Sequence, residues 1–128
     1  MAVPTMGVVV LDCPDTRRLA DFYARMLGWK IDEARSDSSW TEVVDEEGRR
    51  RLAFQEAPGF VPPEWPSAEH SQQFHLDLDV PPARIEEAER EVLELGARLV
   101  QDDGDGARSF RVYADPAGHP FCLCLVDR

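Results

Sequence analysis

Hydrophobic and polar residues follow two patterns along the chain, and the patterns recur in the same order. A β-branched run at residues 8–11 precedes a segment, 15–27, in which apolar residues are spaced three and four apart, as in an amphipathic helix. Short strand-like segments follow at 29–34, 39–44 and 51–56. The first part of the chain is therefore predicted to fold as a strand, a helix and three more strands.

The same order of elements is predicted for the second part of the chain. A strand is expected at 74–80 and an amphipathic helix over 83–95, followed by strands at 97–101, 109–114 and 120–126. Equivalent residues are separated by nearly constant offsets, which are 67 for Val8 and His75, 68 for Gly28 and Gly96, and 70 for Asp45 and Asp115. The economical interpretation is an internal duplication, although turns attract Asp and Gly in unrelated sequences as well.

A proline-rich segment at 57–72 connects the two modules, which span residues 1–56 and 73–128. The segment is long for a connection inside a compact domain. It also contains Phe60 and Trp65, and a disordered linker usually lacks aromatic residues. Two interpretations are open, a stiffened linker whose aromatic side chains pack on a neighbouring surface, and a lid that presents Trp65 to a ligand. The length of 128 residues fits a single domain made of both modules.

Charge and composition restrict the possible partners. The chain has 25 acidic and 14 basic residues and a net charge of −11, which opposes binding to nucleic acid because Lys and Arg must neutralise the phosphates. No segment approaches the roughly 20 apolar residues of a membrane span, and residues 1–11 lack the features of a signal peptide. The three cysteines, Cys13, Cys122 and Cys124, lack the spacing of a disulfide scaffold. The sequence therefore predicts a reduced, cytoplasmic protein with neither nucleic-acid nor membrane partners.

Several short motifs resemble the vicinal-oxygen-chelate superfamily of glyoxalases, bleomycin-resistance proteins and dioxygenases. They are residues 8–15 (VVVLDCPD), Asp21-Phe22-Tyr23, Leu27-Gly28-Trp29, and residues 115–121 (DPAGHPF). The likeness is closest to the bacterial glyoxalase-like domain branch and covers essentially the whole chain. It implies an α+β fold in which two tandem βαβββ modules form a cupped, partly open mixed sheet barrel, with a ligand in the cleft between the modules. In members that use a metal, it implies ligands on the first and last strands of each module.

The metal positions implied by this resemblance are mostly occupied by unsuitable residues. By this resemblance, the first-strand ligand position is occupied by Val8 in the first module and by His75 in the second. The last-strand ligand position of the second module is occupied by Cys122. In the first module the last-strand position falls near residues 52–53, with Gln55 as the nearest polar residue. One imidazole and one thiol make a poor site for Mn²⁺, Fe²⁺ or Ni²⁺, and catalytic zinc needs three protein ligands. We therefore predict no metal ligands and no cofactor, with an atypical divalent metal as the alternative.

Strand alternation predicts which side chains face the ligand, because residues two apart on a strand share a face. The candidate ligand-binding residues are Trp40, Gln55, Trp65, Asp77 and Cys122, and the candidate catalytic residues are His75 and Glu42. The imidazole of His75 could serve as a group that titrates near neutral pH, or as a hydrogen-bonded structural histidine. Asp12 and Asp79, on the same predicted face, could simply be solvated at the rim.

Two functions of different classes follow from these residues. The first is a metal-independent module that binds a small organic ligand for sequestration or resistance, with Trp40, Phe60 and Trp65 supplying stacking area. The second is a lyase, isomerase or dioxygenase-type enzyme in which His75 works with Glu42 or Cys122, or acts as a general base. The fold alone does not decide between them. A homodimer is expected, since a two-fold pair is the commonest assembly of identical chains.

Overall fold

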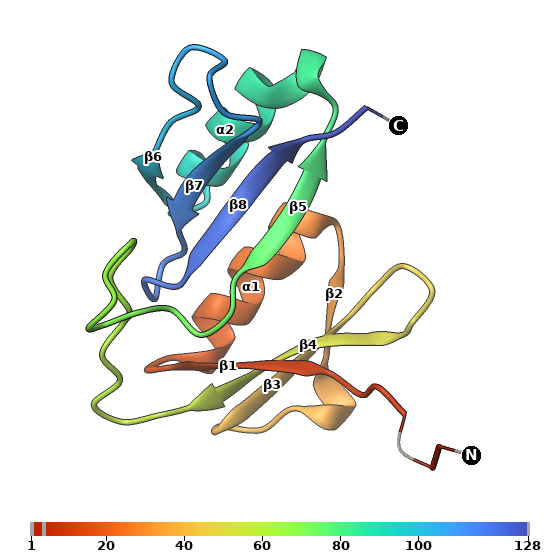
Figure 1. Cartoon of the computed structure of the whole chain (residues 1–128). Coiled ribbons are helices and arrows are strands. Elements are labelled where there is room, and N and C mark those ends of the chain that lie inside the picture. Colours follow the sequence, from red (N-terminus) through yellow and green to blue (C-terminus); the bar gives the residue numbers. More distant parts are fainter. Residues whose placement is uncertain (1, 4, 128) are drawn as a thin grey trace. The chain divides into compact units, whose positions relative to one another are not determined.

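The computed structural model describes residues 2–3 and 5–127, and the chain divides into two compact units, Met1–Phe60 and Val61–Arg128 (Figure 1). The division lies inside the connecting segment predicted at 57–72. Each unit combines one α-helix with a four-stranded mixed sheet, which confirms the predicted α+β class. Within the part of the chain that is described, no helix is both long enough and apolar enough to cross a membrane.

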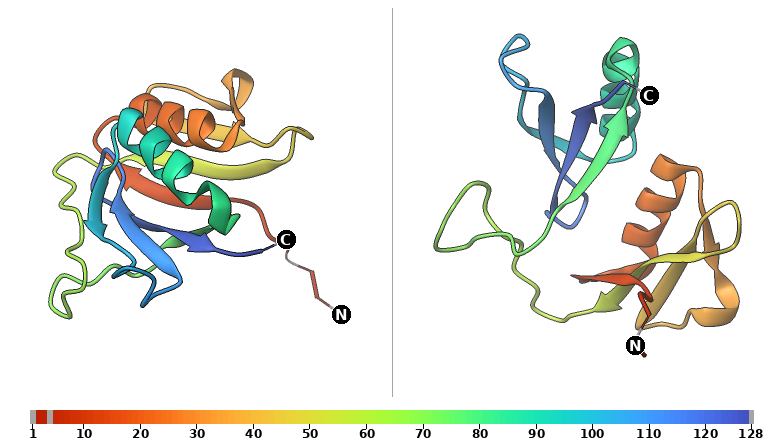
Figure 2. Two further views of the ribbon diagram at one scale, coloured as in Figure 1. Left: turned by 90° about the horizontal axis from the view of Figure 1, so that it is seen from above. Right: turned by 45° about the vertical axis from the view of Figure 1, so that its right-hand side comes forward.

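The first unit is an open sheet with α1 on one of its faces (Figure 2). Its elements are β1 (Val9–Cys13), α1 (Thr16–Leu27), β2 (Lys30–Asp32), the 3-10 helix η1 (Glu33–Arg35), β3 (Trp40–Val44) and β4 (Arg50–Glu56). The strand order is β1-β4-β3-β2, and β1 runs parallel to β4 while the other pairs are antiparallel. The helix begins where the side chain of Asp15 accepts the N–H of Arg18 at 3.1 Å, and it ends at Gly28, whose φ of 72° is left-handed.

The second unit repeats this topology. Its elements are β5 (Leu76–Val80), the 3-10 helix η2 (Pro82–Arg84), α2 (Ile85–Glu94), β6 (Arg98–Gln101), β7 (Phe110–Ala114) and β8 (Pro120–Leu125). The strand order is β5-β8-β7-β6, with β5 parallel to β8 and the remaining pairs antiparallel. Order and direction are therefore the same in both sheets, as an internal duplication predicts.

The turns that precede β4 and β8 match down to individual hydrogen bonds. Asp45 Oδ1 accepts the backbone N–H groups two and four residues further along, both at 2.9 Å. Asp115 Oδ1 accepts the equivalent two N–H groups at 2.9 and 3.0 Å. Gly48 and Gly118 complete the two turns with φ values of 81° and 99°, which glycine adopts without steric penalty. The equivalent Asp and Gly positions of the sequence thus have equivalent structural roles.

Each unit has an apolar core of its own. In the first, Tyr23 of α1 stacks on Phe54 of β4 with ring centroids 5.6 Å apart. In the second, Tyr113 of β7 stacks on Phe121 of β8 at 5.5 Å, and its hydroxyl donates to Glu89 of α2 at 2.8 Å. Buried aromatic pairs of this kind contribute about 0.5–1.5 kcal/mol beyond the area they bury. They fix each sheet and thereby the side chains on its other face.

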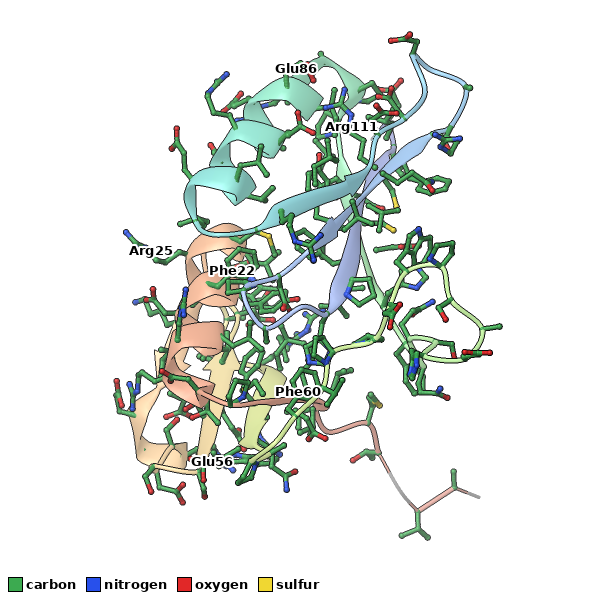
Figure 3. All side chains as sticks on the ribbon, turned by 90° about the vertical axis from the view of Figure 1, so that its left-hand side faces the viewer. Phe22, Arg25, Glu56, Phe60, Glu86 and Arg111 are labelled. Atoms are coloured by element: carbon green, nitrogen blue, oxygen red, sulfur yellow. The ribbon has the colours of Figure 1, made fainter. Side chains whose placement is uncertain are left out.

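Arg111 of β7 is held by carboxylates from α2 and from the loop before β7. Its guanidinium lies 2.7 Å from Glu86, 3.2 Å from Glu89 and 2.9 Å from Asp103, and Figure 3 shows Arg111 and Glu86 side by side. Desolvation opposes the charged form, but the surrounding carboxylates raise the pKa of Arg111 above its ordinary value. This network fastens α2 to the sheet.

Some predicted boundaries are wrong for physical reasons that the structure shows. The strand predicted at 29–34 stops at Asp32, whose side chain accepts the N–H of Ala34 at 3.2 Å and starts η1. The strand predicted at 74–80 begins at Leu76. The parallel register would pair His75 with Pro120, and proline has no N–H to donate to the ladder. His75 therefore lies immediately before β5 and not within it.

Candidate functional site

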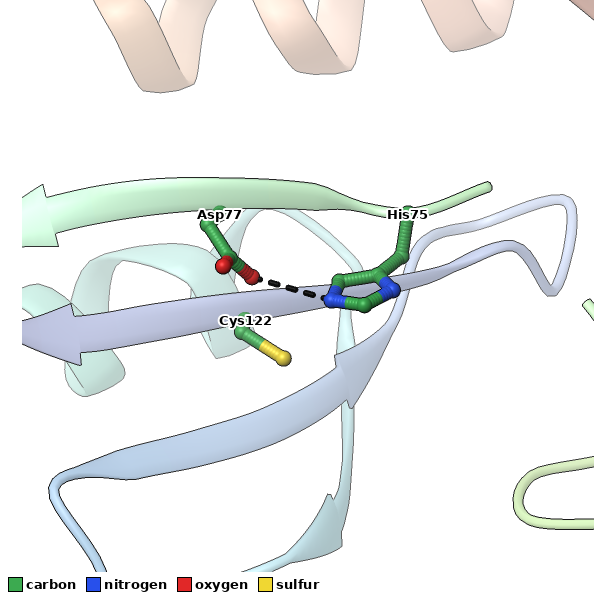
Figure 4. Close-up of side chains that lie close together, drawn as sticks. All are labelled: His75, Asp77 and Cys122. Carbon is green, nitrogen blue, oxygen red and sulfur yellow. Dashed lines mark ion pairs between the residues drawn. The ribbon is translucent and has the colours of Figure 1, made fainter. Parts of the chain in front are cut away.

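Three of the predicted site residues, His75, Asp77 and Cys122, lie together in the second unit (Figure 4). Asp77 of β5 is the direct partner of Cys122 on β8, and His75 is two residues before Asp77, so both extend from the same face. His75 Nε2 lies 3.0 Å from Asp77 Oδ1. One ligand atom from each of the three residues lies within 4.8 Å of the other two. Strand pairing thus assembles an imidazole, a carboxylate and a thiol at one place.

The connecting segment completes the surroundings of His75. Gln72 Oε1 lies 3.2 Å from His75 Nδ1, and the indole of Trp65 meets the imidazole edge-on with ring centroids 5.9 Å apart. The indole Nε1 of Trp65 is buried and has no hydrogen-bond partner among the described residues. Trp65, which the sequence left open as a packed linker residue or a lid residue, therefore packs against the candidate catalytic histidine.

Two thiols lie beside Asp77 in a setting that keeps them protonated. Burial, with a further contribution from the negative charge of Asp77, raises the pKa of Cys122 to about 12. The same two causes raise the pKa of Cys124 above its ordinary value. Because the thiolate is the reactive form of cysteine, neither side chain is activated as a nucleophile in this arrangement.

The predicted residues Trp40, Glu42 and Gln55 all lie in the first unit. Glu42 is only 4% exposed, and its oxygens accept hydrogen bonds from Arg50 at 2.7 and 3.0 Å and from Trp40 Nε1 at 2.9 Å. The bonds from Arg50, and then the bond from Trp40, hold the pKa of Glu42 below its ordinary value. Gln55 is exposed and is the register partner of both Trp40 and Asp12. The structure thus gives Glu42 a structural ion pair, and its catalytic role stays a prediction.

Sequence reasoning missed two residues that matter at these places. Gln72 lies in a segment without periodicity, so no pattern indicated its contact with His75. Arg50 carried a usable signal, because a hairpin that turns at 45–48 brings position 50 near position 42 across the strand pair. Opposite charges at such positions are expected to pair, and Arg50 and Glu42 do so.

Comparison with known families gives one match of nearly full length. Residues 8–124, which include parts of both units, match the family model described as "Glyoxalase-like domain". No curated protein matches the sequence.

Solved structures with the same fold are similar over almost their whole length. A glyoxalase/bleomycin resistance protein/dioxygenase family enzyme from Burkholderia phytofirmans has a TM-score of 0.70 at 14% identity, with 94% of this chain and 98% of that chain covered. The fosfomycin resistance protein FosX from Mesorhizobium loti has a TM-score of 0.67 at 12% identity, with 99% and 95% covered. FosX from Listeria monocytogenes, solved with Mn(II) and 1S,2S-dihydroxypropylphosphonic acid, has a TM-score of 0.67 at 12% identity, with 98% and 95% covered. At these identities the likeness shows the fold alone.

Proposed function

We propose a function from the premise that the chain belongs to the glyoxalase-like domain family. In this proposal the chain binds a small organic ligand through its second unit, as a sequestration or resistance protein does. The observation that supports the proposal is the arrangement of Trp65, His75 and Asp77. The indole of Trp65, whose buried N–H has no hydrogen-bond partner among the described residues, meets the imidazole edge-on, and the imidazole in turn contacts the carboxylate. Such a combination of aromatic area with a few convergent polar groups is typical of small-molecule sites.

The buried N–H of Trp65 gives the proposal its energetic basis. A buried donor without a partner costs about 1–3 kcal/mol relative to a hydrogen-bonded one. An acceptor atom on a ligand that reaches Trp65 would remove this penalty and would gain contact with the ring. Trp65 is therefore expected to determine affinity, while His75 and Asp77 orient the polar groups of the ligand.

The charges near the site indicate which ligands are favoured. Asp77 is 59% exposed, and its one ion pair among the described residues is with His75. The chain as a whole carries a net charge of −11. Neutral or amine-bearing ligands are therefore favoured over anions such as phosphonates. The proposed binding needs no metal ion held by oxygen ligands.

Intrinsic tryptophan fluorescence tests the proposal with bleomycin, fosfomycin and a set of aromatic amines, using protein treated with a chelator. We expect saturable quenching by amine-bearing compounds and not by fosfomycin. Trp65→Ala should weaken binding by about 0.5–1.5 kcal/mol, which is a factor of roughly 2–12, and His75→Ala should weaken it as well. Trp29→Phe, in the first unit, is the matched control. A compound that binds both site variants as tightly as the wild type would contradict the assignment.

A second candidate function is favoured by the 3.0 Å contact between His75 and Asp77. A carboxylate that orients an imidazole is the usual support of a general base. In this alternative the protein is a lyase, isomerase or dioxygenase-type enzyme in which His75 removes a proton from the bound substrate. Turnover of a bound compound by the wild type, lost in Asp77→Asn while binding persists, would favour the enzyme over the binding protein.

We also propose that the chain forms a homodimer in the cytoplasm. β1 and β5 are edge strands of their sheets, and Val9 and Val10 on β1 are 38% and 41% exposed, so that β1 offers an apolar edge. Cys13, Cys122 and Cys124 are thiols, as is usual in a reducing compartment. Light scattering at micromolar concentration should give twice the mass of the chain, and the mass of a single chain would contradict the dimer.

A further inference from the structure

The ligand atoms at His75, Asp77 and Cys122 do not suit the metal found in the Listeria neighbour. That structure contains Mn(II), and Mn²⁺ favours carboxylate, carbonyl and water ligands. Here the strand register places a thiol, Cys122, directly opposite Asp77. Sulfur ligands favour Zn²⁺ and other soft metals instead. The residues of the second unit therefore do not fit an Mn²⁺ centre.

We propose that His75, Asp77 and Cys122 form a site for a thiophilic divalent metal ion, of which Zn²⁺ is the physiological example. The family resemblance implies only two ligands in this unit, His75 and Cys122, and two are too few for zinc. The structure adds Asp77 as a third ligand, from within the same unit. This inference goes beyond the proposed binding of an organic ligand, because it concerns the metal alone.

The spacing of the three side chains suits a tetrahedral ion. Zinc bonds of about 2.0–2.3 Å place neighbouring ligand atoms about 3.3–3.8 Å apart. The candidate atoms already lie within 4.8 Å of one another, and His75 Nε2 and Asp77 Oδ1 are 3.0 Å apart. The backbone of Asp77 and Cys122 is fixed by the β5–β8 pairing. Small side-chain rotations would therefore complete the set without any movement of the backbone.

Gln72 and Trp65 hold the imidazole in a suitable orientation. An Nδ1–H of His75 donated to Gln72 Oε1, at 3.2 Å, leaves the lone pair of Nε2 directed toward Asp77 and Cys122. The edge-on contact with Trp65 restrains the ring further. Metal-binding histidines usually have such a hydrogen-bond partner on the other ring nitrogen, and its loss weakens metal affinity roughly 10- to 100-fold.

Charge also favours a cation here. Among the described residues, no Arg or Lys forms an ion pair with Asp77. A bound Zn²⁺ would replace the proton on Cys122, so that the thiol and the free ion give a zinc thiolate and one released proton. The two positive charges of the ion would balance the thiolate and the carboxylate. Three protein ligands leave a fourth position to water or to a donor atom of a ligand.

Absorption spectroscopy with Co²⁺ tests the site without relying on any activity. The full chain is purified without a metal-affinity tag, treated with a chelator and kept reduced, and is then titrated with Co²⁺ and afterwards with Zn²⁺ or Mn²⁺. We expect one Co²⁺ per chain with a thiolate-to-metal charge-transfer band that Zn²⁺ removes and Mn²⁺ does not. Zn²⁺ should also raise the Tm of the protein.

Variants separate the three ligands from their neighbours. Cys122→Ser should abolish the charge-transfer band, and Asp77→Asn and His75→Ala should each weaken Co²⁺ binding by more than about tenfold. Cys124→Ser, which changes a thiol on the same face outside the group, is the matched control and should keep the band. Because Cys122 is buried, circular dichroism checks that each variant is folded, and the variants of the more exposed His75 and Asp77 keep the test decisive.

Three results would overturn the inference. They are the absence of both a Co²⁺ band and Zn²⁺ stabilisation in folded wild-type protein, a band that persists in Cys122→Ser, and displacement of Co²⁺ by Mn²⁺ at equal concentration. Each of these results leaves the organic-ligand proposal standing, because that binding is measured after chelator treatment.

Discussion

The two units share one topology, yet equivalent positions in them carry different chemistry. Val10 of β1 pairs with Ala53 of β4, and the equivalent pair in the second unit is Asp77 with Cys122. Two apolar residues thus stand where the second unit has a carboxylate and a thiol. The residue two positions earlier differs in the same way, with Val8 in the first unit and His75 in the second.

The next strand shows the reverse distribution. Ala53 pairs with Glu42 on β3, whereas Cys122 pairs with Val112 on β7. Each sheet thus has a row of three paired residues, Val10–Ala53–Glu42 in the first unit and Asp77–Cys122–Val112 in the second. The first unit carries its carboxylate at the third position of this row, and the second unit carries its polar groups at the first two positions. In each unit one part of the row is polar and the other part is apolar.

A carboxylate on this face can form a structural ion pair or stay accessible to a ligand, depending on its partners. Glu42 is buried and accepts hydrogen bonds from Arg50 and Trp40, so its charge is balanced by a cation of the same unit. Asp77 is exposed, and its one ion pair among the described residues is with a histidine. The carboxylate of the first unit is therefore part of a structural ion pair, and that of the second unit is accessible to solvent.

Transfer of the three polar residues of the second unit to the equivalent positions of the first unit should have the largest effect. The triple variant Val8→His, Val10→Asp and Ala53→Cys gives the first unit the three residues of the second, next to Glu42. We expect binding of a second Co²⁺ per chain with an increased thiolate charge-transfer band. Ala53 is fully buried, so overpacking costs roughly 1–3 kcal/mol, and Ala53→Cys alone controls for it. A folded triple variant that binds no additional Co²⁺ would show that strand register is insufficient to make the site.

Removal of Arg50, the exposed cation that pairs with the buried carboxylate of Glu42, should destabilise the first unit. Arg50→Ala leaves the carboxylate of Glu42 buried without its main partner, and we expect the free energy of unfolding to fall by clearly more than in a surface-pair control. Urea denaturation measures the change. Arg49→Ala is the matched control, because Arg49 and its partner Glu47 are 72% and 66% exposed and such surface pairs contribute about 0–1 kcal/mol. Equal losses in both variants would mean that the Glu42 ion pair has no special weight.

The two equivalent turn glycines should differ because only one has a close neighbour. Gly48→Ala meets no atom within 4 Å, so its cost is the left-handed φ alone, about 1–2 kcal/mol. A Cβ on Gly118 would lie 2.5 Å from Cβ of Pro62 in the connecting segment, and Gly118→Ala should cost roughly 1–2 kcal/mol more. Thermal unfolding of both variants compares them. An identical loss would indicate that the segment carrying Pro62 moves away at little cost.

The sequence was sufficient to predict the order of elements, because local signals determine it. Amphipathic spacing indicated both helices, and the Asp and Gly residues of the turns marked the hairpins that the hydrogen bonds of Asp45 and Asp115 confirm. Boundaries were less predictable where two signals competed. The predicted strand at 74–80 had a β-like pattern throughout, but the register that pairs Leu76 with Phe121 would place His75 opposite Pro120, and this register cannot be seen in the sequence.

The candidate site was predictable only as far as alternation reaches. Period-two spacing correctly gave a common face to His75 and Asp77, and to Trp40 and Glu42. It did not reveal that Asp77 lies opposite Cys122, because pairing partners depend on register between distant strands. The contact between Trp65 and His75 was also hidden, since it depends on the path of a segment without periodicity.

The smallest expected effect is a change in acid sensitivity that distinguishes the buried carboxylate from a surface one. The hydrogen bonds of Arg50 hold the pKa of Glu42 below its unfolded value. Its contribution to stability is therefore fully present above the ordinary pKa of glutamate, about 4.3, and it is lost as the pH falls through the folded-state pKa. Each pH unit over which the two states differ by one bound proton changes the free energy by about 1.4 kcal/mol, so the effect is a difference in slope.

Urea denaturation between pH 6 and pH 3 measures that slope. The wild type should lose stability more steeply than Glu42→Gln, whose side chain binds no proton in this range. Glu87→Gln is the control from the second unit: Arg84 lowers the pKa of Glu87 as well, but the two side chains are 43% and 64% exposed and solvent screens the pair. Its acid limb should therefore stay close to that of the wild type. If Glu87→Gln flattened the curve as much as Glu42→Gln does, burial would not be what gives the carboxylate of the first unit its structural role.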